Sequence, residues 1–148
     1  MFNKVECHLD NRGLWITARI LLAVVFLSSG VAKLIDFQGG LNEMRAAGLH
    51  PDWFFNIVTA LVLVTGAVLI ILDKALWLGA IALIIFLLLT IPFVHRFWDM
   101  QQSDAPQALY WAMEHVSLAG GLASAAIASR FRRRLHKALE LYCGVIQR

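Results

Sequence analysis

Two apolar runs stand almost back to back in this sequence, and they restrict its fold more than any other feature. Residues 53–72 and 75–94 contain no Asp, Glu, Lys, Arg or His, and only Asp73 and Lys74 separate them. A hydrocarbon core about 30 Å thick needs about 20 apolar residues of helix to cross it. The two runs therefore predict a pair of membrane-spanning helices joined by a tight hairpin.

The composition supports a membrane protein. Of the 148 residues, 59% are hydrophobic and 16% are charged, whereas soluble domains have about 25% charged residues. A soluble domain of this length could not bury so much apolar surface. We therefore expect lipid to be the solvent for much of the chain.

A further span is expected near the start of the chain. Arg19 and Lys33 leave only 13 uncharged residues between them, which would also suit a secretory signal peptide. We favour a span, because both side chains can extend to the membrane interfaces and the helix then matches the others in length. With a fourth apolar stretch, the prediction is an all-α integral membrane fold, a four-transmembrane-helix bundle with spans at 15–35, 53–72, 75–94 and 110–129.

Four spans place both ends of the chain on one side of the membrane, and Lys and Arg decide which side. Ten of the 13 basic residues lie on the side of the chain ends. We therefore expect a cytoplasmic N-terminal segment (1–14), a transmembrane domain (15–129) and a cytoplasmic tail (130–148). The loops 36–52 and 95–109 are then outside.

The tail is basic and amphipathic. Phe131, Leu135, Leu139 and Tyr142 recur about every four residues, with arginines between them. This pattern predicts an amphipathic helix lying on the membrane surface, with anionic lipid rather than nucleic acid as its partner. A simpler role as a positive anchor remains an alternative.

The first span carries two cations on one helical stripe, which consists of Arg19, Ala23, Phe26, Gly30 and Lys33. The small residues of this stripe would let a second helix come close. Both cations could simply extend to the interfaces, and Lys33 could also pair with Asp36 three residues later.

The fourth span carries a carboxylate at membrane depth, on a stripe of Glu114, Ser117, Gly121, Ser124 and Ala128. Small-residue stripes pack against other helices, so we expect Glu114 to point into the bundle. A protein partner or a second copy of the chain could also use such faces. The alternative role for Glu114 is a buried carboxylate neutralised by protonation or by an arginine.

In this topology His95 and His115 both lie at the outer ends of their spans. The same side also holds Lys33, Asp36, His50 and Asp52. A carboxylate and an imidazole can exchange protons with a quinone, and an apolar crevice would hold its ring. Two histidines could instead ligate haem, which we favour less because interfacial histidines are usually solvated. No His or Cys spacing predicts a metal site.

Short motifs follow one another through most of the chain. They are Ala18–Leu22, Phe26, Ser29–Leu34, Asp36–Phe37, Met44, Gly48–Leu49, Gly66, Phe93–Trp98 and Ser117–Leu122. Over about residues 14–128 this order resembles the DoxX-like family of small bacterial and archaeal inner-membrane proteins.

The resemblance implies a four-helix bundle in the bacterial inner (cell) membrane and an association with redox complexes. Its members include a subunit of a thiosulfate:quinone oxidoreductase and a membrane partner of oxidative-stress enzymes. Many relatives carry a glutamate where this chain has Val62, and Lys-Asn where it has Glu114 and His115. We therefore expect the acidic group to have moved to the fourth span.

These observations favour a redox-associated membrane subunit that binds quinone or a similar lipophilic ligand near the outer leaflet. If it is enzymatic, it would act within a quinone-linked oxidoreductase. The candidates for ligand binding or proton exchange are Glu114, His115, His95, Arg19 and Lys33. The alternatives are a non-catalytic scaffold or docking subunit, and a small-solute or proton transporter, for which four helices leave little room.

Overall fold

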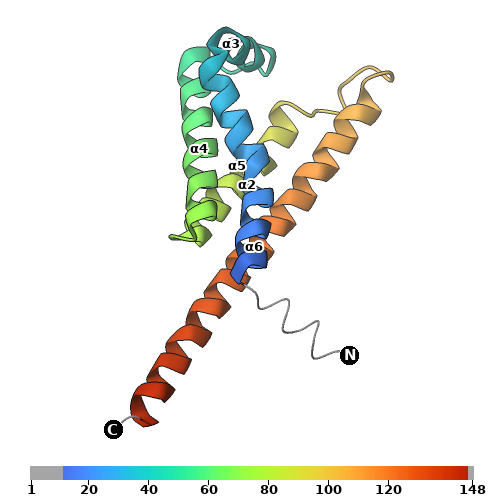
Figure 1. Ribbon diagram of the computed structural model, residues 1–148. Coiled ribbons are helices and arrows are strands. Elements are labelled where there is room, and N and C mark those ends of the chain that lie inside the picture. Colours follow the sequence, from blue (N-terminus) through green and yellow to red (C-terminus); the bar gives the residue numbers. More distant parts are fainter. Residues whose placement is uncertain (1–11, 147–148) are drawn as a thin grey trace.

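Five helices and no strand make up residues 12–146, the part of the chain described by the computed structural model (Figure 1). Side-chain positions are described for residues 12–138. The helices are α2 (Arg12–Ile35), α3 (Phe37–Ala46), α4 (Asp52–Leu72), α5 (Leu76–Phe93) and α6 (Ala105–Ile146). Within this part, α2, α4 and α5 are long and apolar enough to cross a membrane. The predicted all-α membrane fold is confirmed at this level.

Helices α4 and α5 form the tight hairpin that the sequence predicts. Asp73 and Ala75, in the connection, have positive φ angles of 56° and 51°. The two helices approach closely at Gly66 and Gly79. A Cβ on Gly79 would lie only 2.8 Å from the backbone oxygen of Gly66. A residue larger than glycine at this position would push the helices apart.

Helix α2 packs against α4 through the stripe expected from its sequence. The buried residues of α2 are Arg19, Ala23, Phe26 and Gly30. A Cβ on Gly30 would lie 3.2 Å from the backbone oxygen of Ala60 in α4. The prediction that small residues on this stripe admit a second helix is confirmed.

The segment expected as the loop 36–52 contains a short helix, α3, which lies across the ends of α2 and α4 (Figure 1). Asp36 caps it, because its carboxylate accepts a hydrogen bond of 2.9 Å from the backbone N–H of Gly39. Lys33 forms its ion pair with Glu43 of α3. The predicted pairing of Lys33 with Asp36 is therefore wrong, since Asp36 is used by the helix end.

Helix α6 is 42 residues long and continues without a break through Ser129. The sequence predicts a span and a separate surface helix, but residues 122–143 contain neither glycine nor proline to interrupt the helix. The tail therefore continues the axis of residues 105–129 instead of turning aside. Helix α6 packs chiefly on α5 and only slightly on α2, from which it diverges (Figure 1).

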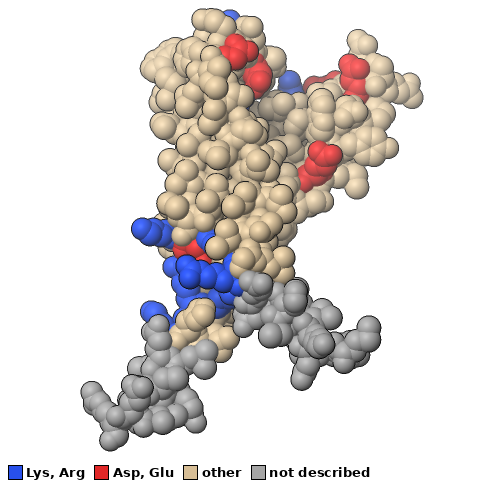
Figure 2. All heavy atoms as spheres, in the orientation of Figure 1, with Lys and Arg blue, Asp and Glu red and all other residues tan. Residues whose placement is uncertain are grey.

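The helices give the molecule two different ends. The tail end contains Arg12, the Asp73–Lys74 turn and the part of α6 from Ser129 onward (Figure 1). The loop end contains α3 and residues 94–104. Figure 2 shows Lys and Arg gathered at the tail end, next to a broad surface without charged side chains.

Candidate functional site

An open crevice of about 1250 Å³ lies at the loop end and is lined by residues from all five helices. Figure 2 shows the hollow between the α3 side of the molecule and the start of α6. Most lining residues are apolar, among them Phe26, Leu63 and Leu87. Pockets for drug-sized ligands measure about 300–1,000 Å³, so this crevice has room for a large lipophilic molecule.

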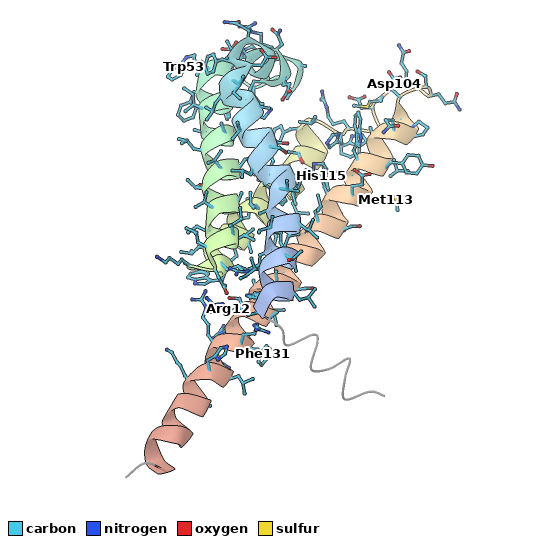
Figure 3. The ribbon with its side chains drawn as sticks, in the orientation of Figure 1. Arg12, Trp53, Asp104, Met113, His115 and Phe131 are labelled. Atoms are coloured by element: carbon cyan, nitrogen blue, oxygen red, sulfur yellow. The ribbon has the colours of Figure 1, made fainter. Side chains whose placement is uncertain are left out.

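Two histidines meet at one wall of the crevice. His95 directly follows α5, and its backbone N–H donates to the carbonyl of Thr90 at 3.1 Å. Its ring centroid lies 4.9 Å from that of His115 and 5.4 Å from that of Trp111, both in α6. Figure 3 shows His115 on the side of α6 toward the hollow and Met113 on the other side. The predicted convergence of His95 and His115 is confirmed.

The surroundings of His95 favour its neutral form. Partial burial, followed by the neighbouring His115, lowers the pKa of His95. Near pH 7 the His95 ring is therefore uncharged and has a nitrogen lone pair that can accept a proton. A proton taken up by one ring would disfavour a second proton on the other.

The structure places Glu114 outside this site. Its side chain is exposed, it is not among the lining residues, and it has no hydrogen bond or ion pair with any described residue. Among residues 105–138 of α6, the buried side chains are those of Ala108, Ala112, Leu122 and Ser129. The prediction that the Glu114 stripe packs inside is therefore wrong for the single chain.

The physical reason lies in the contact with α5, which is almost wholly apolar and covers the Ala and Leu face of α6. Small and apolar side chains on that face let the two helices pack closely, whereas a carboxylate there would be enclosed without a hydrogen-bond partner. The transporter alternative would use Glu114 as a carboxylate relay, and this side chain lies outside the crevice in the single chain.

Lys33 and Arg19 lie at opposite ends of α2. Lys33 lines the crevice and pairs with Glu43. Arg19 is buried at the tail end, where its Nη1 donates to the carbonyl of Ile71 at 2.9 Å. Of the five candidate residues, the structure thus brings Lys33, His95 and His115 to the crevice, and it excludes Arg19 and Glu114.

Asp73 holds the tail end together, and the sequence predicts only a turn there. Its carboxylate accepts hydrogen bonds from Trp15 Nε1 at 3.0 Å, Ser129 Oγ at 2.6 Å and Arg133 Nη2 at 3.2 Å, and Arg19 Nη1 lies 3.7 Å away. Burial raises the pKa of Asp73, but the hydrogen bonds outweigh it, so this pKa is lowered. The partners lie more than 50 residues away, so no local pattern reveals them.

Residues 12–138 contain no group of three His, Cys, Asp or Glu side chains that could hold a metal ion.

Comparison with known proteins now identifies the family. The DoxX family model matches residues 14–96. This chain belongs to the DoxX family. It is also 27% identical over 114 residues to the inner membrane protein YphA of Escherichia coli (strain K12), which covers 77% of this chain and 81% of the relative. No solved structure matches the chain.

The DoxX match covers α2 to α5 and includes His95, but it ends before α6. Val62, where the resemblance places a glutamate in many DoxX relatives, lines the crevice. Since Glu114 faces outward, it does not replace that carboxylate in the crevice. The expectation that the acidic group has moved from α4 to α6 is therefore wrong for the crevice, because Glu114 lies outside the site that Val62 lines.

A second polar residue that the sequence analysis missed is Asn56 of α4. It is fully buried, and its Nδ2 donates to the carbonyl of Lys33 at 3.3 Å. Its Oδ1 has no hydrogen-bond partner among the described residues and lies against Gly40 of α3. A single amide in a span without charged residues is the signal that would have revealed it.

Proposed function

We propose that this DoxX-family chain is a four-span protein of the bacterial inner membrane whose loop-end crevice binds a quinone or a similar lipophilic ring. The observation that carries the proposal is the His95–His115 pair at the wall of a large apolar crevice. The apolar lining suits the ring and its tail, and the two imidazoles suit its polar oxygens.

In this proposal α6 is the fourth span. Residues 105–129 of this helix extend about 37 Å at 1.5 Å per residue, which is enough to cross a core of about 30 Å. The tail end is cytoplasmic, because it carries most of the basic residues. Residues 1–14 and 130–148 then flank a transmembrane domain of residues 15–129.

The ring would reach the site from the bilayer through the open side of the crevice, whose lining includes residues of both α2 and α6. Reduction of a quinone consumes two electrons and two protons, and its oxidation releases them. The neutral His95 ring accepts a proton from a quinol hydroxyl, and His115 relays it toward the open loop end. A partner subunit of a quinone-linked oxidoreductase supplies or removes the electrons.

The test uses Trp111 as a reporter, because its ring lies 5.4 Å from His95. The full chain in mild detergent is titrated with a short-chain ubiquinone analogue, and tryptophan quenching gives the Kd. We expect the double substitution His95→Gln/His115→Gln to weaken binding about thirtyfold, because it removes two hydrogen bonds worth about 1 kcal/mol each. Trp111→Phe should remove most of the saturable quenching.

Glu114→Gln serves as the matched control, since this carboxylate faces away from the crevice. It should leave the Kd unchanged. Unaltered binding in the double histidine variant would disprove the assignment of the pair. A visible spectrum of the purified chain would reveal haem, the weaker alternative.

A second candidate function is a docking subunit. The observation that favours it is the exposed stripe of Glu114, Ser117, Gly121 and Ser124 on α6. A carboxylate facing lipid costs on the order of 3 kcal/mol, so a protein neighbour, such as a second copy of this chain, would stabilise it. Gly121→Leu/Ser124→Leu should then lower the mass of the particle in detergent, measured by light scattering, without changing quinone binding.

A further inference from the structure

The arginines that follow Ser129 fall into two groups. Arg133 donates to the backbone and the carboxylate of Asp73, and the guanidinium carbon of Arg132 lies 5.6 Å from the ring centroid of Trp15. Arg130 and Arg134, in contrast, are exposed and form no hydrogen bond or ion pair with any described residue. The charges of these two side chains are thus not neutralised within the described chain.

Arg130 and Arg134 share one side of α6 with two apolar residues. The two arginines are four positions apart, so their side chains are neighbours on the helix surface. Together with Ile127 and Phe131 they line a cavity of about 360 Å³. Ile127 and Phe131 are 58% and 65% exposed, and Figure 3 shows Phe131 at the tail end of the molecule.

If α6 spans the membrane as proposed above, this cavity lies at the level of the phospholipid head groups. The apolar part of α6 ends at Ser129, and residues 130–134 form the next helical turn, about 5.4 Å long. The head-group layer on each side of a bilayer is about 5–8 Å thick. The two guanidinium groups therefore lie at the level of the phosphates, and Ile127 lies about one turn deeper.

We propose that Arg130 and Arg134 bind the phosphate of an anionic phospholipid in the tail-end leaflet, while Ile127 and Phe131 contact its acyl chains. Guanidinium groups bind phosphate oxygens in pairs of parallel hydrogen bonds. A zwitterionic lipid such as phosphatidylcholine would bring the positive charge of its choline group into the band of Lys and Arg seen in Figure 2. A lipid fits better than an acidic protein, because the exposed apolar pair continues the apolar surface of the helix.

The experiment measures lipid binding to the full chain in detergent by native mass spectrometry, with phosphatidylglycerol and phosphatidylcholine as probes. We expect the unaltered chain to prefer phosphatidylglycerol. Arg130→Gln/Arg134→Gln should reduce that preference on the order of thirtyfold, the fold-change that corresponds to about 1 kcal/mol for each of the two basic residues. Phe131→Ala should weaken the binding of both lipids.

Arg12→Gln/Lys137→Gln is the control for charge, because it also removes two exposed cations from the tail end. It should keep the preference for phosphatidylglycerol. An equal loss in both double variants, or equal binding of the two lipids by the unaltered chain, would overturn the site. Displacement of phosphatidylglycerol by inorganic phosphate or by polyglutamate at the same concentration would also overturn it, since the acyl chains would then contribute nothing.

Discussion

Asp73 connects three parts of the molecule at the tail end. It follows α4 in a left-handed conformation and accepts hydrogen bonds from Trp15 of α2 and from Ser129 and Arg133 of α6. Arg19, which is buried, has this carboxylate as its counter-ion. A buried cation without a counter-ion is strongly destabilising, so this carboxylate makes the position of Arg19 tolerable.

Asp73→Asn should lower the free energy of unfolding by about 1–3 kcal/mol, because it removes the charge that several donors share. Thermal unfolding in detergent would measure this, with Asp99→Asn in an exposed loop as the control. Since the pKa of Asp73 is lowered in the folded chain, its contribution is complete above its ordinary value of about 3.9 and is lost as the pH falls further. If the difference in stability between the unaltered chain and the Asp73→Asn variant stayed constant down to about pH 2, this role would be contradicted.

His95 gives a pH dependence of the same sign as Asp73, but at higher pH. Its pKa is lowered in the folded chain, so the unfolded chain binds a proton more readily. Stability is therefore unaffected well above the ordinary value of about 6.5 and falls as the pH decreases through it. His95→Gln should flatten the stability profile between about pH 5 and 7.

At the scale of elements, close helix contacts depend on a few glycines. Helices α4 and α5 meet at Gly66 and Gly79, and α2 meets α4 at Gly30. These contacts fix the two walls of the crevice relative to each other. Helix α6 has no comparable contact with α2 among the described residues, which explains why the two helices diverge at the loop end.

Gly79→Ala should destabilise the chain by about 1–3 kcal/mol, because the new methyl group would press on the backbone of α4. Gly120→Ala is the matched control, since a Cβ there would meet no atom within 4 Å. The control should be neutral or slightly stabilising, because alanine favours a helix. Equal unfolding temperatures for the two variants in detergent would argue against the close α4–α5 contact.

At the scale of the whole molecule, the distribution of charge separates the two ends. Basic residues gather at the tail end, whereas the crevice and the histidine pair lie at the loop end (Figure 2). In the proposed orientation a ligand in the crevice sits near the outer leaflet. Protons exchanged there would pass to or from the external side.

The orientation predicts the behaviour of reporters in cells. A fluorescent protein fused to the C-terminus should fold and fluoresce, because four spans return the chain to the cytoplasm. With Cys7 and Cys143 replaced by Ser, the Ser103→Cys variant should react with a membrane-impermeant maleimide in intact cells, and the Lys74→Cys variant should react only after permeabilisation. A dark fusion together with a reactive Ser103→Cys variant would mean that α6 does not cross the membrane.

The elements that depend on local order could be predicted from the sequence. Long uncharged runs can be identified without knowing which helices they contact, so the α4–α5 hairpin was predicted correctly. Helical periodicity placed Arg19, Ala23, Phe26 and Gly30 on the buried face of α2. Topology alone brought His95 and His115 to one end of the molecule, because the ends of adjacent antiparallel spans meet.

The covered face of α6 and the contacts of Asp73 and Asn56 depend on the tertiary structure. The small-residue stripe of α6 predicted that Glu114 is buried, but α5 covers the face that carries Ala108, Ala112 and Leu122, which leaves Glu114 exposed. The partners of Asp73 come from distant helices. Periodicity specifies which residues share a face, but the choice of neighbour depends on the free energy of packing the whole assembly of helices.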